Sequence, residues 1–162
     1  MKPNRLNRFS LLCSLICYLI VCCPPTLTAQ QQPREVVRIL AVGNSFSDDG
    51  VEYLDELAKA AGIRLIVGNL YIGGCSLERH WENVSKGLPA YDYRKNCEGV
   101  QSNTPKTSLL SALQDEPWDY ITVQQVSQNS GLYDTYYPFM PSLLQYLRTH
   151  ATNPGVRFDI HQ

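Results

Sequence analysis

A serine stands at the end of an apolar run in the stretch "RILAVGNSFSDDG", residues 38–50. A serine at a strand-to-helix turn presents its hydroxyl above a sheet, where the free N–H groups of the next helix can stabilise a developing oxyanion. Ser45 is therefore a candidate nucleophile, and the alternative is that it only caps the helix. Its polar neighbours Ser47, Asp48 and Asp49 are expected to start that helix.

Two other clusters of unusual residues follow apolar runs further along the chain. Gly73 and Gly74 offer a tight turn that lets a backbone N–H approach a reacting carbonyl, with an ordinary turn as the alternative. Gln124 and Gln125 lie side by side in an apolar run, where an unpaired buried amide costs about 1–3 kcal/mol. Because neighbouring strand residues point to opposite faces, only one of the two glutamines can serve a common site.

Alternating strand and helix patterns would position these clusters. The first two apolar runs are apolar on both faces, which is typical of strands covered on both sides. Strands alternating with helices predict an α/β domain with a parallel sheet, whereas the polar and aromatic segment 73–105 is expected to be mostly loop. The expected strands cover residues 36–42, 65–71, 120–126 and 156–161, and the expected helices cover residues 51–61, 108–114 and 141–148.

Ligands of open parallel sheets bind beyond the carboxyl ends of the strands. The blocks "GNSFSDD", "IGGCSLERHW" and "QQVSQNSG" follow three of the expected strands, and together they resemble the SGNH (GDSL-like) hydrolases. The similarity runs from Arg38 onward and is greatest to the branch known as domain of unknown function 4886, which tolerates "GNS" in place of "GDS". It implies a three-layer α/β/α sandwich with a parallel sheet, SGNH- or flavodoxin-like, here without its last strand and helix.

The resemblance also implies roles for individual residues. Ser45 would attack an ester carbonyl, and the N–H groups of Ser45 and Gly74 would hold the oxyanion. Most relatives add an asparagine side chain, in whose place this sequence offers Gln124 or, less favoured, Gln125. Further residues expected to contact substrate are Asn44, His80, Trp81 and His161.

The general base is the point at which the sequence departs from the family pattern. Relatives carry the triad aspartate and histidine in a later D-x-x-H block, and that block is absent here. His80 is expected in the loop wall, His150 at a helix end and His161 at the end of the fourth strand. We therefore expect a fragment of a longer secreted esterase that is inactive on esters as given, or else a degenerate relative.

Two other functions follow from the same residues. A non-catalytic glycan-binding protein would keep the fold without the triad, whereas a flavodoxin-like phosphate loop is disfavoured because the acidic residues after Ser45 would repel a phosphate. Aromatic residues with a few cations suit stacking on sugar rings, so a glycan ester or another small ester is the expected ligand, with packing of the loops as the alternative role. These residues are Arg79, Trp81, Tyr91, Tyr93, Arg94, Lys95, Tyr133, Tyr136 and Tyr137.

Composition excludes several other classes. The formal net charge is −1 and no basic run occurs, so nucleic acid is not an expected partner. No zinc-ligand spacing and no nucleotide-binding glycine loop is present, so neither a metal nor a cofactor is expected. Cys75 and Cys97 are candidates for a disulfide in an exported protein. The sequence gives no signal for an oligomeric state.

Residues 1–29 have the pattern of a signal peptide. The basic residues at their start precede an apolar stretch, residues 9–23, that is short compared with the roughly 20 residues of a membrane span. Cleavage after Ala29 would give a secreted or periplasmic protein without a membrane span, and lipidation at Cys22 or Cys23 is the alternative. The remaining chain would consist of a linker, residues 30–35, and one domain, residues 36–162.

Overall fold

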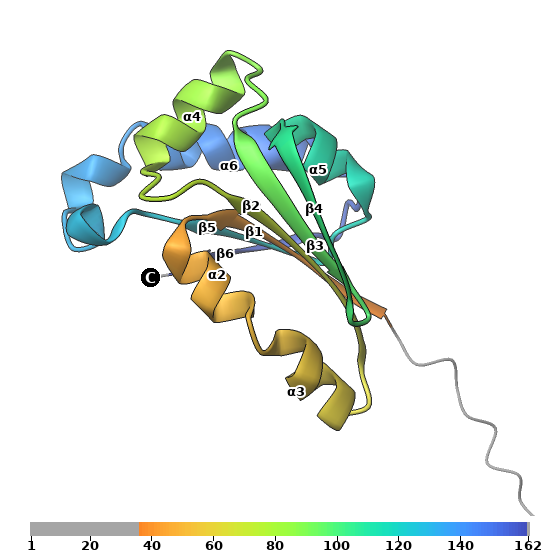
Figure 1. Ribbon diagram of the computed structural model, residues 1–162. Coiled ribbons are helices and arrows are strands. Elements are labelled where there is room, and N and C mark those ends of the chain that lie inside the picture. Colours follow the sequence, from red (N-terminus) through yellow and green to blue (C-terminus); the bar gives the residue numbers. More distant parts are fainter. Residues whose placement is uncertain (1–35, 162) are drawn as a thin grey trace, which may run out of the picture. The chain divides into compact units, whose positions relative to one another are not determined.

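The computed structural model describes residues 36–161, so the expected signal peptide, the linker 30–35 and the candidate lipidation sites Cys22 and Cys23 lie outside the described residues. The described residues form one six-stranded sheet with helices on both faces, which confirms the predicted α/β/α architecture and is consistent with a flavodoxin-like fold (Figure 1). The strand order is β4-β3-β2-β1-β5-β6. The strands are β1 (Val36–Gly43), β2 (Arg64–Tyr71), β3 (Tyr91–Cys97), β4 (Val100–Thr107), β5 (Tyr120–Gln124) and β6 (Arg157–His161).

The four strands expected from the sequence form the parallel part of the sheet. β2 pairs with β1, β1 with β5 and β5 with β6, in each case in parallel. The apolar runs end within two residues of the predicted bounds, and β2 is buried over six consecutive residues, as expected for a strand covered on both faces. The carboxyl ends of β1, β2 and β5 therefore meet at one edge of the sheet, where the three clusters follow.

The prediction of a long loop over residues 73–105 is wrong. This segment contains a helix and then a hairpin, β3 and β4, that extends the sheet in antiparallel fashion from β2. Tyr91 and Tyr93 are buried, but the residues between and after them are charged or polar, and seven of the eight residues of β4 are exposed. An edge hairpin of this kind carries no continuous apolar pattern, so the hydrophobic periodicity did not reveal it.

Two of the three expected helices differ in their bounds from the sequence prediction, whereas the expected helix 108–114 is confirmed to within one residue. The expected helix 51–61 is two helices, of which the first already begins at Ser45, and the last helix begins at Phe139. Among the described residues, no helix is long and apolar enough to span a membrane. The α-helices are α2 (Ser45–Val51), α3 (Leu54–Ala60), α4 (Leu77–Ser85), α5 (Leu109–Asp115) and α6 (Phe139–His150), and two 3-10 helices, η1 (Ser127–Asn129) and η2 (Tyr133–Tyr136), follow β5.

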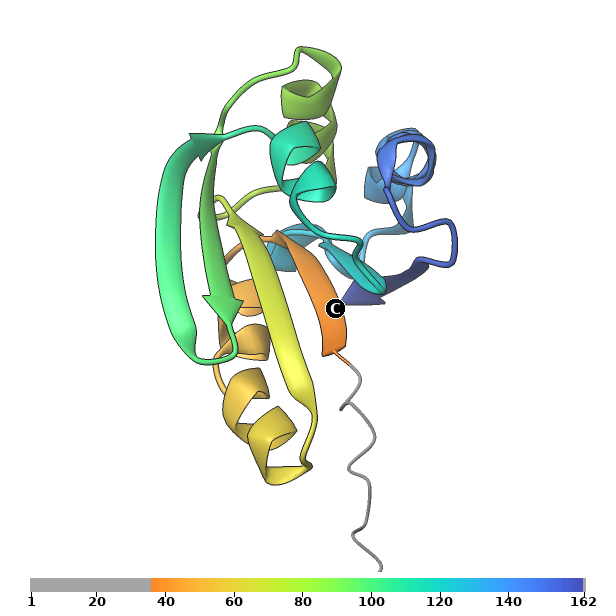
Figure 2. The ribbon, with the colours of Figure 1, turned by 90° about the vertical axis from the view of Figure 1, so that its right-hand side faces the viewer.

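The two faces of the sheet carry cores of different size. Figure 2 shows α2 and α3 on one face and α4, α5 and α6 on the other. The larger core lies under α4–α6 and includes the fully buried Trp118, whose indole N–H donates to the Ala112 carbonyl at 2.9 Å. The smaller core joins Ala58 of α3 to Leu65 and Val67 of β2. Val51 of α2 packs against this smaller core, and α2 is also held against the sheet by polar contacts, which are described below.

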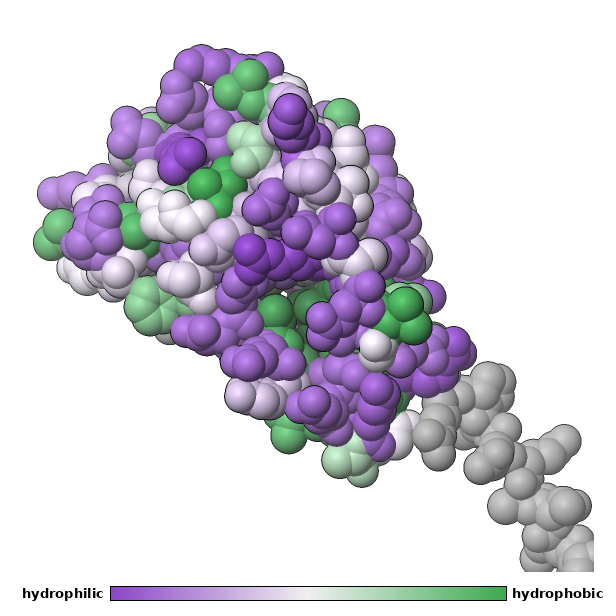
Figure 3. Space-filling view, in the orientation of Figure 1, coloured by the Kyte–Doolittle hydropathy of each residue, from purple (hydrophilic) through white to green (hydrophobic). Residues whose placement is uncertain are grey.

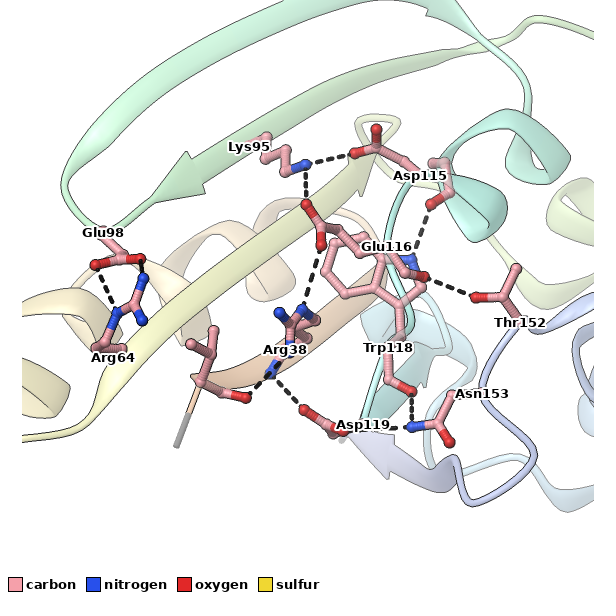
Figure 4. A network of polar contacts seen from close by, with 12 residues as sticks. Arg38, Arg64, Lys95, Glu98, Asp115, Glu116, Trp118, Asp119, Thr152 and Asn153 are labelled. Carbon is pink, nitrogen blue, oxygen red and sulfur yellow. Dashed lines mark hydrogen bonds and ion pairs between the residues drawn. The ribbon is translucent and has the colours of Figure 1, made fainter. Parts of the chain in front are cut away.

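A polar network closes the sheet at the amino ends of β1, β5 and β6 (Figure 4). Asp119 accepts a hydrogen bond from the Arg38 backbone N–H at 2.9 Å, and the Arg38 guanidinium pairs with Glu116 at 3.2 Å. Glu116 also pairs with Lys95 at 2.6 Å, and Asn153 donates to Asp119 at 3.3 Å. These contacts tie the hairpin to the parallel strands at the edge opposite the three clusters.

Candidate functional site

Helix α2 starts one residue after β1, and its cap is Asn44. The Asn44 side-chain oxygen accepts from the Phe46 N–H at 3.1 Å, which satisfies one of the donors that a helix N-terminus leaves unpaired. The prediction that Ser47, Asp48 or Asp49 would start the helix is therefore wrong by three or more residues. The apolar pattern that predicts this helix begins only at Val51, and an asparagine cap directly after a strand is not part of such a pattern.

Gly43 permits the close approach of α2 to the strands. A Cβ atom placed on Gly43 would lie 2.7 Å from the Ser47 Cβ and 2.9 Å from the Gln124 Oε1. Only glycine therefore fits at the end of β1, which explains the glycine of "GNS" as a packing requirement. The consequence is that Asn44 and Ser45 emerge directly over the carboxyl edge of the sheet.

Ser45 is the first residue of α2 and is exposed. Its Oγ makes no hydrogen bond within residues 36–161, and its N–H, as the first of the helix, has no intrahelical acceptor. The side chain is therefore available to a ligand, and the N–H is available to an anion. Asn44, and not Ser45, caps the helix, and the Ser45 side chain makes no hydrogen bond in the described part of the chain that would stabilise the fold.

The glycine turn after β2 is connected to the residue before Ser45. Gly74 has a φ of 61°, the left-handed region that favours glycine, and a Cβ placed there would meet nothing within 4 Å. The Asn44 side-chain NH₂ donates to the Cys75 carbonyl at 3.2 Å, so the residues beside Ser45 and Gly74 are joined directly. An open glycine backbone and an exposed serine thus share one corner of the sheet.

Gln124 and Gln125 point to opposite sides, as predicted from strand alternation. Gln124 is buried, its Oε1 accepts from the Asn44 N–H at 3.5 Å, and its Nε2 lies 3.5 Å from His161 Nδ1. Gln125 is also buried, and its Oε1 accepts from the Leu77 N–H at 3.0 Å. Both amides have partners within the protein, and an oxyanion contact by Gln124 or Gln125 stays a prediction.

Asn44 and Gln125 together hold the three strand-end loops. The Asn44 amide donates to the Gln125 carbonyl at 3.4 Å as well as to Cys75. Asn44 is 1% exposed and uses both ends of its amide inside the protein, so the predicted substrate contact by Asn44 does not fit its position. It holds the loops after β1, β2 and β5 together at the carboxyl edge.

A polar network on the other flank of α2 was missed by the sequence analysis. The Asn69 NH₂ donates to Asp48 at 2.6 Å, and its Oδ1 lies 2.9 Å from the Ser47 hydroxyl. The second Asp48 oxygen pairs with Arg94, whose guanidinium lies 3.9 Å from the centre of the Tyr71 ring. The one signal that could have revealed Asn69 is a polar side chain inside an otherwise apolar strand.

Below this network a hollow opens between α2 and the β3–β4 hairpin (Figure 3). It has a volume of about 130 Å³, with Val51 and Val67 among its apolar lining residues and Asp48, Asn69 and Arg94 among its polar ones. Arg94 was expected beside a ligand, and the structure instead places it in an ion pair that fixes α2. The hollow does not include Ser45 among its lining residues.

His80 lies in α4 and not in a loop wall, so that prediction is wrong. The side chain is fully buried, stacks on Tyr91 at a ring-centroid distance of 5.7 Å and has its Nδ1 3.0 Å from the Tyr91 hydroxyl. Burial lowers the pKa of His80 to about 3. Its neighbour Trp81 is half-buried and packs against the larger core. The fully buried His80 is not exposed to a ligand, and a substrate contact by Trp81 stays a prediction.

The two other histidines also have local partners. His150 lies at the end of α6 with its Nδ1 2.9 Å from the Tyr146 carbonyl, which fits the predicted position at a helix C-terminus. His161 ends β6, and its ring lies against Gly50, where a Cβ would be only 2.8 Å from the ring. Within the described part of the chain, no histidine makes a hydrogen bond to Ser45.

The predicted disulfide between Cys75 and Cys97 is wrong, because both cysteines are free. Cys97 pairs with Ile66 near the start of β2, whereas Cys75 follows the end of that strand. Five residues of strand span about 17 Å, and a disulfide needs Cα atoms within roughly 7 Å. Burial raises the pKa of Cys75 to about 12, so this thiol is not an alternative nucleophile.

The corner around Ser45 offers a free hydroxyl and free backbone N–H groups, but none of the described residues supplies a base to it. Among residues 36–161, no group of three or more histidine, cysteine or acidic side chains could hold a metal ion. The chemistry that this arrangement fits is nucleophilic attack by Ser45 with stabilisation of an anion by backbone donors.

Comparisons with known proteins place this arrangement in a family without assigning a function to it. A family model described as "Domain of unknown function (DUF4886)" matches residues 38–162. A crystal structure of a DUF4886 family protein from Bacteroides uniformis ATCC 8492, at 1.50 Å resolution, is 47% identical with a TM-score of 0.76. The match covers 79% of this chain and 50% of that protein, so the chain spans half of its length. A search of curated proteins finds no match.

Proposed function

Because the chain belongs to the DUF4886 family, whose function is unknown, we propose its activity from the site itself: Ser45 is the nucleophile of a serine esterase of the SGNH type. The observation that carries the proposal is the free, exposed hydroxyl of Ser45 at the first position of α2, beside the open turn at Gly74. A serine without a structural partner, over the carboxyl edge of a parallel sheet, lies where such folds bind ligands.

In this proposal the Ser45 Oγ attacks the acyl carbon of an ester. The carbonyl oxygen becomes an oxyanion held by the N–H groups of Ser45 and Gly74, with the NH₂ group of Gln124 as the third donor if it is released from His161. Collapse breaks the ester C–O bond, the alcohol leaves with the proton taken from Ser45, and water then releases the acid. The proton carrier is assigned to a residue of a longer form of the protein, since the relative is about twice as long as the matched part and all three histidines of this sequence have other contacts.

A fluorophosphonate probe, followed by peptide mass spectrometry, tests the proposal. The chain as given should react slowly at Ser45, because no base contacts its hydroxyl, and the longer Bacteroides uniformis relative should react rapidly at the aligned serine. Ser45→Ala should abolish the remaining reaction, whereas Ser127→Ala, at an exposed serine of the same edge, should leave it unchanged. An unreactive relative would contradict the esterase proposal, and rapid reaction of this chain would contradict the assignment of the base.

A second function, a non-catalytic glycan-binding protein, is favoured by the exposed tyrosines after β5, and none of residues 36–161 contacts the Ser45 hydroxyl as a base. It differs from the first in two outcomes. Ser45→Ala would then leave sugar binding intact, and no longer form of the protein would hydrolyse an ester. Under either function, we propose that the protein is secreted or periplasmic, which is supported by the residue pattern at positions 1–29.

A further inference from the structure

A groove that the esterase proposal does not use lies between η2, α6 and β6. Its volume is about 970 Å³, within the roughly 300–1,000 Å³ typical of ligand sites. We call it the tyrosine groove and define it by six of its lining residues: Tyr133, Tyr136, Tyr137, Leu144, Gln145 and Arg148. The lining residues Ser130 to Tyr137 belong to the segment that follows the carboxyl end of β5.

Two tyrosines present their rings to solvent in this groove. Tyr133 is 72% exposed and Tyr137 is 51% exposed, and their ring centroids are 5.1 Å apart. The Tyr133 hydroxyl donates to the Tyr137 hydroxyl at 3.2 Å, and the two rings are tilted by 48°, so this pair, which we call the platform, presents two joined aromatic faces at an angle. Exposed aromatic side chains that are held together in this way mark contact surfaces and not a packed core.

The polar residues of the groove indicate the class of ligand. Gln145, Arg148 and Thr149 offer amide, guanidinium and hydroxyl groups, and no carboxylate is among the described residues that line the groove. Planar donors beside aromatic faces match a ligand that has apolar C–H faces and many hydroxyl groups, which is the chemistry of a saccharide. Leu144 and Tyr136 would then pack against the less polar face of the ligand.

Gln125 fixes the groove relative to Ser45. Its NH₂ group donates to both the carbonyl and the hydroxyl of Thr135 at 3.2 Å, and Thr135 lies in η2 between the platform residues. The Thr135 hydroxyl lies 2.6 Å from the Leu132 carbonyl, which closes the turn. Since the Gln125 carbonyl accepts from Asn44, one residue connects η2 to the N-terminus of α2. Hydrogen bonds therefore connect the turn that carries the platform to Asn44, the residue before the candidate nucleophile.

We propose that the tyrosine groove binds a saccharide, with Tyr133 and Tyr137 stacked on sugar rings and Gln145 and Arg148 donating to sugar hydroxyls. As the binding site for the glycan part of an ester that Ser45 would attack, the groove rests on the proposed function. Saccharide binding itself does not require Ser45, so the two ideas can fail separately.

Isothermal titration of the purified chain with xylotetraose, chitotetraose and cellotetraose tests the inference. At least one of these saccharides should bind, and Tyr133→Ala or Tyr137→Ala should weaken binding about tenfold, because each removes one stacking face. Tyr120→Ala is the matched control, since Tyr120 is 39% exposed beside Arg157, outside the groove. Ser45→Ala should not change binding. Unchanged thermal unfolding would show that the variants fold.

The remaining outcomes separate the two proposals. Binding that is lost in Tyr120→Ala but kept in Tyr133→Ala, or no binding of any of the three saccharides, would overturn the groove assignment. A chain that dimerises, is made monomeric by Ile160→Asp and binds no saccharide would show that a second copy covers the groove instead. Saccharide binding without any reaction at Ser45 or at the aligned serine of the relative would leave the groove in place and remove the esterase proposal.

Discussion

Asn44 is the residue on which the candidate site depends, although it carries no chemistry of its own. Its Oδ1 caps α2 through the Phe46 N–H, and its NH₂ group reaches the carbonyls of Cys75 and Gln125. The neighbouring Ser45 makes none of these contacts. The three residues of "GNS" therefore have different roles. Gly43 permits the close approach of α2 to the strands, Asn44 joins the loops after β1, β2 and β5, and the Ser45 side chain makes no hydrogen bond to the described residues.

This difference between Asn44 and Ser45 predicts that alanine substitution lowers stability strongly at Asn44 and little at Ser45. Asn44→Ala should lower the free energy of unfolding by about 1–3 kcal/mol, because it removes a helix cap and leaves two buried carbonyls without a donor. Ser45→Ala should change it by less than about 0.5 kcal/mol, because the side chain is exposed and unbonded. Urea denaturation followed by tryptophan fluorescence measures both. A larger loss for Ser45→Ala would show that Ser45 has a structural role.

His80 should make stability depend on pH. Burial lowers its pKa from 6.5 to about 3, so between these values the unfolded chain binds a proton that the folded chain does not. The contribution of the neutral imidazole to stability is therefore complete above pH 6.5 and is lost progressively as the pH falls toward 3. The limiting slope for one such proton is about 1.4 kcal/mol per pH unit.

The measurement is the difference between wild type and His80→Gln in the free energy of unfolding from pH 4 to pH 7. The glutamine variant keeps a hydrogen-bonding side chain near Tyr91 and removes the titration, so its free energy should fall less steeply as acid is added. Titrating carboxylates contribute equally to both proteins and cancel in the difference. Parallel curves for the two proteins would show that His80 is accessible to protons in the folded state.

At the scale of elements, the parallel part of the sheet was predictable and the hairpin was not. β1, β2 and β5 are largely apolar runs with buried residues, as expected for strands inside a covered sheet, and such runs stand out in a sequence. β4 is the outermost strand of the sheet and β3 is the next one in. Their charged residues, including Arg94 and Lys95, have the polar pattern of a loop, so the sequence predicted a loop there. The candidate site was predictable as far as Ser45 and Gly74, which carry sequence motifs. The Asn69–Asp48 contact depends on tertiary packing and carries none.

The register of the hairpin predicts the behaviour of the two cysteines. Cys97 is exposed at the end of β3, whereas Cys75 is buried at the other edge with a raised pKa. Iodoacetamide should therefore modify Cys97 in the folded protein and Cys75 only after unfolding, as read by peptide mass spectrometry. The thermal unfolding midpoint should be the same with and without dithiothreitol, because both cysteines are free. A peptide pair linked through Cys75 and Cys97 would contradict the observed register.

At the scale of the described domain, polar networks lie at both edges of the sheet. The carboxyl edge holds Asn44 and the Asp48–Asn69 contact, and the amino edge holds Arg38, Asp119 and Asn153. Arg38 and Asn44 are six positions apart, a distance of about 20 Å along an extended strand. The amino-edge network can therefore stabilise the sheet without touching the groups that would bind a ligand.

Double-mutant cycles test this separation across the domain. Asp48→Ala and Asn69→Ala should be coupled by at least about 0.5 kcal/mol in the free energy of unfolding, because the two side chains share a 2.6 Å hydrogen bond. Asp48→Ala and Asn153→Ala act at opposite edges and should be additive within about 0.5 kcal/mol. Both cycles use the same Asp48 variant, so a general loss of rigidity in that variant would appear in each. Coupling of equal size in the two cycles would mean that the edges respond as one unit, and substitutions in the amino-edge network would then be expected to alter ligand binding beside Ser45.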